Sequence, residues 1–150
     1  MTEIERKFLV TQAKLPELSQ FKSFTIAQAY IQNEPFRSVR VRIKGDKAFL
    51  TIKSGKNALS RLEFEYEIPV VEAQEMMDKM ELKSLSKTRY IIPFEGKTWE
   101  LDVFHGKLAG LIVAEIELTD ENETFALPEW IGEEVTHDSA YLNANLIKQL

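Results

Sequence analysis

The chain repeats short runs in which charged residues take every second position. In the first run, residues 1–10, Glu3, Glu5 and Lys7 share one face of a strand, because successive strand side chains point to opposite faces. Two carboxylates and an ammonium in one row are costly to enclose unless a ligand or an ion shares the site. The spacing therefore predicts a site for a charged ligand.

The charges are also sorted by sign. The cationic pairs are Arg40 with Arg42 and Lys87 with Arg89, and the anionic pairs are Glu3 with Glu5, Glu63 with Glu65, and Glu115 with Glu117. Like charges repel when nothing lies between them, whereas a polyanion beside the bases and a cation beside the acids would relieve both repulsions. The pattern indicates a linear polyphosphate held by Arg and Lys, with one or two divalent cations on the carboxylates.

Composition restricts the choice of metal. The chain has no cysteine, and its two histidines, His105 and His137, lie beside loops without a histidine partner at ligand spacing. We expect both histidines to be structural. A hard cation on carboxylate oxygens and water, Mg²⁺ or Mn²⁺, is therefore the expected cofactor.

Length and charge set the broad class. The 150 residues, 44% hydrophobic and 29% charged, predict one globular domain over residues 1–150. No apolar run approaches the roughly 20 residues of a membrane helix, and the first residues lack signal-peptide features, so we expect a cytoplasmic protein. The net charge of -5 argues against nonspecific binding to nucleic acid or anionic membranes. The oligomeric state stays open, with a homodimer as one alternative.

Period-two patterning and turn residues place the elements. We expect strands at residues 1–10, 24–32, 38–44, 48–54, 61–68, 85–93, 97–104 and 111–118, and helices at 70–80 and 137–150. Gly45-Asp46 and Glu95-Gly96 are the hairpin signals, and the polar residues 55–60 predict a mobile segment. The apolar stripe of the first helix, made of Val71, Met76, Met77 and Met80, is expected to pack on the sheet and not on a partner.

Two orientations of such a sheet are open. In a half-exposed sheet the charged face meets water, and its cross-strand ion pairs contribute about 0.2–1 kcal/mol each. However, the charged positions recur on strand after strand and are nearly free of Thr, Ser and Asn. We therefore predict a mainly β, α+β fold: a closed eight-stranded antiparallel barrel with a charged interior and flanking helices. Trp99 and Trp130 would then pack outside the barrel.

Glu3-Ile4-Glu5-Arg6-Lys7 resembles the Glu-x-Glu-x-Lys signature of the CYTH domain, found in the triphosphate tunnel metalloenzymes. The resemblance continues in order through Arg40-x-Arg42, Lys53, Arg61-x-Glu63-x-Glu65, Lys87-x-Arg89, Asp102 and Glu115-x-Glu117. It is strongest to the short bacterial inorganic triphosphatases. The family resemblance implies a tunnel-forming barrel and metal-dependent hydrolysis of the terminal phosphoanhydride bond of a triphosphate.

The resemblance also implies roles for the charged residues. The metal would be held by Glu3, Glu5, Glu115 and Glu117, with a second ion or metal-bound waters on Glu63, Glu65 and Asp102. The phosphates would be bound by Lys7, Arg40, Arg42, Lys53, Lys87 and Arg89. Arg61 is assigned either to phosphate or to pairing with the carboxylates.

Activation of water is implied for Lys87 with Tyr30. Neighbouring arginines should lower the pKa of Lys87, which would let it act as a base. The alternatives are that Tyr30 is a hydrogen-bonding residue of the tunnel wall and that a metal-bound hydroxide attacks without a protein base.

The expected substrate is inorganic tripolyphosphate, cleaved to pyrophosphate and orthophosphate. Adenylate cyclase and nucleoside or thiamine triphosphatase are alternatives, but the chain shows no base-binding insertion and no thiazolium-binding extension. A noncatalytic polyphosphate- or nucleotide-binding module is the alternative from another class. The last helix follows the last strand, a position that permits it to close one end of the tunnel.

Overall fold

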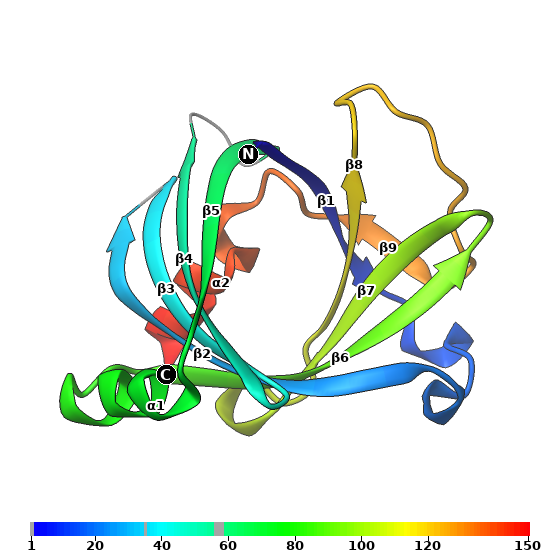
Figure 1. The fold of residues 1–150 in the computed structure, drawn as a ribbon. Helices are drawn as coiled ribbons and strands as arrows, with labels where there is room; N and C mark the ends of the chain where they lie inside the picture. The colour runs from blue at the N-terminus through cyan, green and yellow to red at the C-terminus, as the bar shows by residue number, and fades with distance from the viewer. Residues whose placement is uncertain (1, 35, 56–58) are drawn as a thin grey trace.

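The structure, a computed structural model, describes residues 2–34, 36–55 and 59–150, and its strands close into a barrel (Figure 1). Within these ranges one antiparallel sheet is built from β1 (Thr2–Val10), β2 (Lys22–Glu34), β3 (Arg37–Lys44), β4 (Lys47–Gly55), β5 (Ser60–Ile68), β6 (Ser84–Phe94), β7 (Lys97–Phe104), β8 (Ile112–Leu118) and β9 (Ile131–Glu134). Their order across the sheet is β5-β4-β3-β2-β6-β7-β8-β1-β9.

Strand β1 closes the barrel because it pairs with β8 along one edge and with β5 at the start of the other edge. The start of β1 pairs with β5, where Glu3 lies opposite Arg61, and its end pairs with β9. Strand β8 occupies the other edge. The predicted closed eight-stranded antiparallel barrel is therefore confirmed, with β9 as an additional strand. At four residues, β9 is too short for a period-two pattern to identify it.

Both predicted hairpin turns connect neighbouring strands. Gly45 joins β3 to β4 with a φ of 59°, and Glu95 and Gly96 join β6 to β7 with φ of 50° and 76°. At Glu95 and Gly96, positive φ at both central residues is the geometry of the type I′ turn, which matches the twist of the flanking strands, whereas at the other turn Gly45 has positive φ and Asp46 does not. Of the polar segment 55–60, Gly55 ends β4 and Ser60 begins β5, while residues 56–58 lie outside the described residues.

The apolar core lies between the outside of the barrel and the segments that cover it. Trp99 is fully buried there, with its ring centroid 5.6 Å from that of Phe8 and 5.9 Å from that of Trp130. Both tryptophans therefore pack outside the barrel, as predicted. Because the apolar side chains point outwards, the alternating charged side chains point into the barrel, and the half-exposed sheet is excluded.

Helix α1 (Val70–Lys79) covers part of β3 and β4. Ala73 and Met77 are buried against the cluster that contains Val41, and Met76 is partly buried there. The predicted stripe was wrong for its two ends, since Val71 is 70% and Met80 49% exposed. Only the face one turn long, from Ala73 to Met77, is turned towards the sheet.

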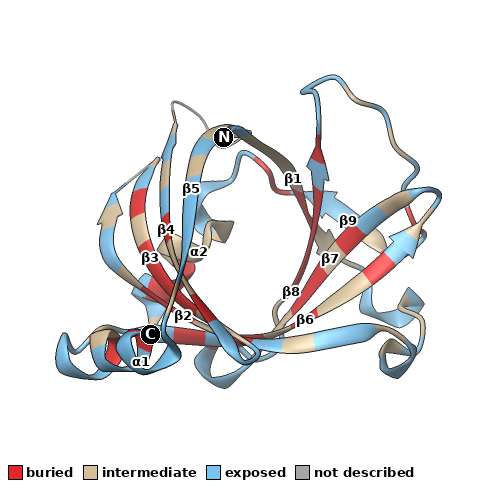
Figure 2. Ribbon diagram, viewed as in Figure 1, coloured by how far each residue is buried: buried red, intermediate tan, exposed pale blue. Residues whose placement is uncertain are grey.

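Much of β5 is exposed (Figure 2), and its outer face stays open. Leu62, Phe64 and Tyr66 are 48%, 45% and 57% exposed. The same strand directs Glu63 and Glu65 into the barrel interior. The strict alternation of charged and apolar residues in β5 therefore predicts which way each side chain points, but not how deeply the apolar side chains are buried.

The prediction of one continuous helix at 137–150 is wrong. Residues 139–149 instead form a 3-10 turn (Ser139–Tyr141), the short helix α2 (Asn143–Leu146) and a second 3-10 turn (Ile147–Gln149). Leu142 interrupts them with an extended backbone, at φ -66° and ψ 134°. The break lets residues 142–144 reach the barrel interior while Leu146 and Ile147 are buried in the apolar cluster outside it.

Among the described residues, no helix combines the length and apolar character that crossing a membrane requires.

Candidate active site

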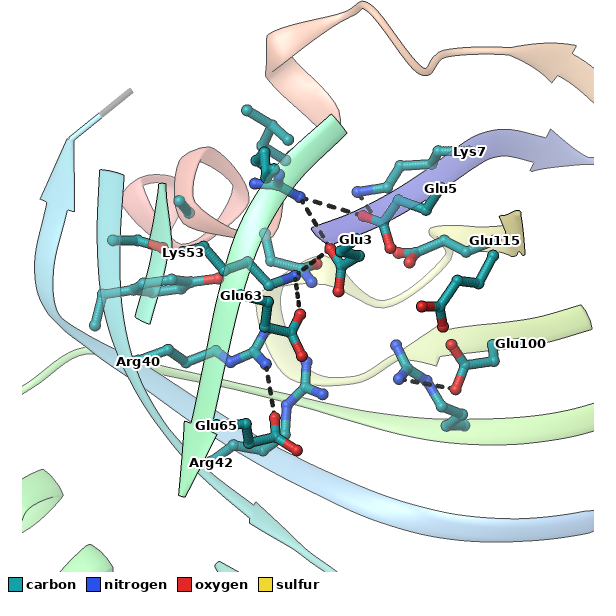
Figure 3. Close-up of a pocket in the computed structure, with 18 residues that line it drawn as sticks. Glu3, Glu5, Lys7, Arg40, Arg42, Lys53, Glu63, Glu65, Glu100 and Glu115 are labelled. Atoms are coloured by element: carbon teal, nitrogen blue, oxygen red, sulfur yellow. Dashed lines mark hydrogen bonds and ion pairs between the residues drawn. The ribbon is translucent and has the colours of Figure 1, made fainter. Parts of the chain in front are cut away.

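The alternating charged residues line one cavity of about 170 Å³ inside the barrel (Figure 3). From the set predicted by sequence, the cavity wall contains Glu3, Glu5, Lys7, Tyr30, Arg40, Arg42, Lys53, Arg61, Glu63, Glu65, Arg89, Glu115 and Glu117. The two remaining predicted residues, Lys87 and Asp102, do not line it. They lie behind the wall, with 0% and 1% of their surface exposed.

Two arginines of β3 lie on the basic side of the cavity. Arg42 is held by Gln28 of β2, whose side-chain oxygen accepts hydrogen bonds from Nε at 2.9 Å and Nη2 at 2.7 Å. Burial, followed by the neighbouring charges of Arg40 and Arg89, lowers the pKa of Arg42 to about 9. Arg42 is therefore still a cation at neutral pH, held in place before any ligand binds.

Arg40 has a buried donor that the protein does not satisfy. Its Nε has no hydrogen-bond partner among the described residues, and its Nη2 lies 3.4 Å from Thr51 Oγ1 and 3.9 Å from Glu65 Oε2. Buried N–H groups almost always have an acceptor. The guanidinium of Arg40 is thus suited to a phosphate oxygen supplied by a ligand.

Basic side chains of β4 and β5 form ion pairs with the carboxylates of β1. Lys53 Nζ lies 2.8 Å from Glu3 Oε1 and 3.4 Å from Glu63 Oε2. Arg61 Nη2 lies 3.2 Å from Glu5 Oε1 and 3.8 Å from Glu3 Oε1. Of the two roles open for Arg61, pairing with carboxylates is the one present in this structure.

The carboxylates on β7 and β8 are less well compensated. Glu100 lies opposite Glu115 in the β7–β8 ladder, and Glu117 lies opposite Glu5 in the β1–β8 ladder. Burial, and then the charges of Glu3, Glu100 and Glu5, raise the pKa of Glu117. Burial also raises the pKa of Glu100, although Arg89 opposes the shift. This side of the cavity would gain from a bound cation.

The donor set fits a hard divalent cation. Several carboxylates face one cavity, and oxygen ligands of this type are those that Mg²⁺ and Mn²⁺ prefer. Across the described ranges, no three histidine or acidic side chains already form a coordination site. Glu3, Glu5 and Glu63 are instead paired with Lys53 and Arg61, so cation binding at these three acids would require exchange of the ion pairs.

Lys87 and Asp102, behind the cavity wall, form a buried ion-pair network with Arg89 of the wall. Asp102 Oδ2 accepts from Lys87 Nζ at 2.7 Å, and both Asp102 oxygens accept from Arg89, at 2.7 and 2.8 Å. Burial would raise the pKa of Asp102, but the two cations lower it to about 2. Asp102 is therefore a fully engaged carboxylate at neutral pH.

Burial lowers the pKa of Lys87 to about 7, even though Asp102 acts in the opposite direction. The predicted lowering by Arg89 and Arg42 is present as a smaller contribution. Tyr30 lines the cavity, and its hydroxyl accepts from Gln28 Nε2 at 3.4 Å. No hydrogen bond joins Lys87 to Tyr30 in the part of the chain that the structure describes.

The C-terminal segment contributes to the cavity wall. Leu142, Asn143 and Ala144 line it, and Tyr141 accepts a hydrogen bond from Lys7 Nζ at 2.9 Å through its backbone oxygen. Asn33 Nδ2 of β2 donates to the backbone oxygen of Ala144 at 2.6 Å. The end of the chain therefore covers part of the barrel interior, as the position of the predicted last helix permits.

Sequence reasoning missed two kinds of lining residue. Glu100 shares a strand face with Asp102, two positions later, and this spacing was the signal that could have identified it. Ser38 and residues 142–144 carry no charge pattern, so no sequence signal marks them. The two histidines do not line the cavity, and His105 Nε2 lies 2.7 Å from Thr88 Oγ1.

Comparison with known proteins agrees with this geometry. The CYTH domain family matches residues 1–149. The chain belongs to the CYTH family. A curated relative, the inorganic triphosphatase of Acetivibrio thermocellus, is 49% identical over 147 residues, covering 97% of this chain and 93% of the relative. The inorganic triphosphatase of Nitrosomonas europaea is 39% identical over 152 residues, covering 97% of both chains.

A solved structure agrees with the fold. The crystal structure of the inorganic triphosphatase NE1496 superimposes with a TM-score of 0.71 at 34% sequence identity, covering 98% of this chain and 95% of the other. The likeness in fold therefore extends over nearly the whole of this CYTH chain.

Proposed function

We propose that this CYTH protein is a metal-dependent hydrolase that cleaves the terminal phosphoanhydride bond of inorganic tripolyphosphate, releasing orthophosphate and pyrophosphate. The observation that carries the proposal is that one cavity presents both arginines, from β3 and β6, and carboxylates, from β1, β7 and β8. A linear triphosphate carrying a divalent cation has the complementary charge distribution. The relatives named inorganic triphosphatase support the same activity.

The basic residues bind and orient the phosphates. Arg40 offers the unpaired Nε, Arg42 is fixed by Gln28, and Arg89 is fixed by Asp102. Lys7 and Lys53 add cations next to the carboxylates. Phosphoryl transfer is governed by positioning and by stabilisation of charge on the transferring group. Guanidinium groups that are held in position before the substrate binds are therefore the main contribution of the chain to catalysis.

The acidic residues hold the cofactor. Glu3, Glu5, Glu115 and Glu117 would bind Mg²⁺ or Mn²⁺, and Glu63 and Glu65 would hold a second ion or its waters. When bound, the cation neutralises phosphate charge and acidifies water. Lys53 and Arg61 keep the carboxylates paired until then, which limits their repulsion in the absence of the ion.

Two observations bear on Lys87 as the base that activates water. Its pKa of about 7 is that of an effective general base near neutral pH. However, its Nζ is fully buried and donates to Asp102, and Tyr30 is not its partner. Proton transfer to Lys87 therefore requires water to enter behind the cavity wall, whereas activation of water by a cation on the carboxylates would require no such step.

The size and lining of the cavity favour an inorganic substrate over a nucleotide. Its volume of about 170 Å³ is below the roughly 300–1,000 Å³ that is usual for organic ligand sites. Tyr30 is the single aromatic residue among the lining residues that the structure describes. A nucleobase or a thiazolium ring would therefore have few apolar surfaces on which to stack.

Phosphate release from purified protein tests the proposal. The substrates are tripolyphosphate, ATP and thiamine triphosphate, each with Mg²⁺, with Mn²⁺ and with chelator. We expect orthophosphate and pyrophosphate from tripolyphosphate only when metal is present, with ATP and thiamine triphosphate turned over more slowly. Cyclic AMP without orthophosphate would identify a cyclase. Binding of tripolyphosphate without turnover would identify a noncatalytic module.

We further propose that residues 1–150 act as a single domain, supported by the family match over residues 1–149. The cytoplasmic location, the homodimer alternative and the absence of nucleic-acid and membrane partners remain predictions of the sequence.

A further inference from the structure

Strand β7 turns two carboxylates of the same face towards different surroundings. Glu100 lines the cavity with 35% of its side chain exposed, whereas Asp102 has 2% exposed and does not line it. The two residues are two positions apart, so the strand pattern alone cannot separate them. Only the structure shows which of them a ligand in the cavity can reach.

The hydrogen bonds separate them further. Asp102 accepts three charge-assisted hydrogen bonds of 2.7–2.8 Å from Lys87 and Arg89, which use both of its oxygens. Glu100 accepts one longer bond of 3.2 Å, from Arg89 Nη1 to Oε2. Its other oxygen, Oε1, has no hydrogen bond among the described residues. A cation would have to break the Asp102 network, but it could bind Glu100 without doing so.

The neighbours of Glu100 are also those of a cation ligand. Glu100 lies directly opposite Glu115 in the β7–β8 ladder, where like charges destabilise a sheet. Lys7 Nζ, 3.6 Å from Glu115 Oε1, compensates only part of this repulsion. A cation shared by Glu100 and Glu115 would remove it, and both residues face the cavity that holds the other proposed ligands.

We propose that the cation-binding carboxylate supplied by β7 is Glu100 and not Asp102, and that Asp102 is a positioning residue that fixes Lys87 and Arg89 against the phosphate site. This assignment rests on the proposed function, because it names a residue for the same metal and phosphate site. It replaces the metal role that the family resemblance implied for Asp102.

Binding of Mn²⁺ to the metal-free protein, measured by calorimetry without substrate, is the direct test. Glu100→Gln should weaken Mn²⁺ binding by about tenfold or more, and Glu100→Asp, which keeps a carboxylate, should recover part of the loss. Asp102→Asn should change Mn²⁺ affinity by less than about threefold. Because no substrate is present, this result is independent of whether tripolyphosphate is the substrate.

Turnover gives a second readout for the positioning role. In Glu100→Gln, the Mn²⁺ concentration for half-maximal turnover should rise, and saturating Mn²⁺ should restore kcat to within about threefold. In Asp102→Asn, kcat should stay low at every Mn²⁺ concentration, because Lys87 and Arg89 lose their anchor. Should Asp102→Asn fail to fold, Lys87→Met combined with Asp102→Asn removes both charges of the buried pair and should likewise retain Mn²⁺ affinity.

The opposite pattern overturns the assignment. If Asp102→Asn or the double variant loses Mn²⁺ affinity as strongly as Glu100→Gln, Asp102 is a metal ligand. If Glu100→Gln binds Mn²⁺ like the unchanged protein, Glu100 is not one. In either case the proposed triphosphate hydrolysis would still be decided by phosphate release from the unchanged protein.

Discussion

Glu5 of β1 lies directly opposite Glu117 of β8, and both side chains face the cavity. Arg61 Nη2, 3.2 Å from Glu5 Oε1, compensates one member of the pair. Although burial opposes the shift, Lys53, Lys7 and Arg61 help to lower the pKa of Glu5, while that of Glu117 is raised by burial and by Glu3, Glu100 and Glu5. The fold therefore keeps one carboxylate pair in repulsion at the place where a cation is proposed to bind.

Glu117→Gln should stabilise the metal-free protein at pH 7. The pKa of Glu117 is raised above 4.5 by folding, so its favourable contribution is present below pH 4.5 and is lost as the pH rises through the folded-state pKa. Because Glu117 is exposed, we expect a Tm gain of only about 1–3 °C at pH 7 and none below pH 4. Thermal unfolding at both pH values measures this. Glu133→Gln, on the exposed part of β9, is the control, and a lower Tm for Glu117→Gln at pH 7 would refute the repulsion.

Glu5→Gln should abolish metal-dependent turnover while leaving the fold intact. The substitution removes a proposed metal ligand but keeps the size of the side chain, so we expect kcat/KM to fall by about 100-fold or more. Phosphate release measures the loss, and circular dichroism checks the fold. With Glu133→Gln as control again, a fully active Glu5→Gln protein would remove Glu5 from the metal site.

Arg61→Gln should tighten Mn²⁺ binding. Its guanidinium pairs with Glu5 and Glu3 at 3.2 and 3.8 Å, so a cation must displace it to reach these carboxylates. Removing the competitor should increase Mn²⁺ affinity by about two- to tenfold, since exposed and partly buried pairs contribute about 0.2–1 kcal/mol or somewhat more. Calorimetry measures the change. If Arg61 instead binds phosphate, Mn²⁺ affinity stays constant and KM for tripolyphosphate rises.

The barrel was predictable because its strands alternate strictly. Residues 61–68 give every odd position a charge and every even one an apolar side chain, and such a pattern fixes which residues share a face. It does not fix what covers the apolar face. Burial depends on other elements, and these leave Phe64 and Tyr66 exposed while residues of β3 and β7 are buried. The strand β9 and the interrupted C-terminal segment carry too few residues each to show any period.

The site was predictable as a set of residues but not as a set of contacts. The period of two places Glu100 and Asp102 on one face, yet it contains no information on depth along the barrel. Asp102 pairs with Lys87 and Arg89 behind the wall, whereas Glu100 reaches the cavity. In the same way, Lys87 and Tyr30 were predicted as a pair, but the β2–β6 register sets Lys87 opposite Ile26, four residues before Tyr30.

Leu146→Ala should destabilise the protein by about 2–5 kcal/mol, as is usual for a buried leucine. Leu146 is 4% exposed and packs with Ile147 in the cluster that contains Leu85 and Phe104. Urea unfolding measures the loss. Leu127→Ala is the matched control, because Leu127 is 57% exposed and should cost less than about 1 kcal/mol. A similar loss in both variants would show that the C-terminal segment is not anchored by this cluster.

The pH dependence of turnover separates the two proposals for water activation. If Lys87 is the base, only its neutral amine is active, so kcat should fall as the pH falls through about 7, the pKa that burial gives this lysine. Lys87→Ala should then lower kcat far more than it changes KM and should abolish this acidic limb, whereas Lys22→Ala, at the exposed start of β2, should retain both. If Lys87→Ala only raises KM and the acidic limb persists, Lys87 contributes its charge to phosphate binding, and the attacking water is activated without a protein base. The burial of Nζ against Asp102 makes this a sharp distinction, because Lys87 can accept a proton only if water reaches Nζ, whereas its charge acts without that contact.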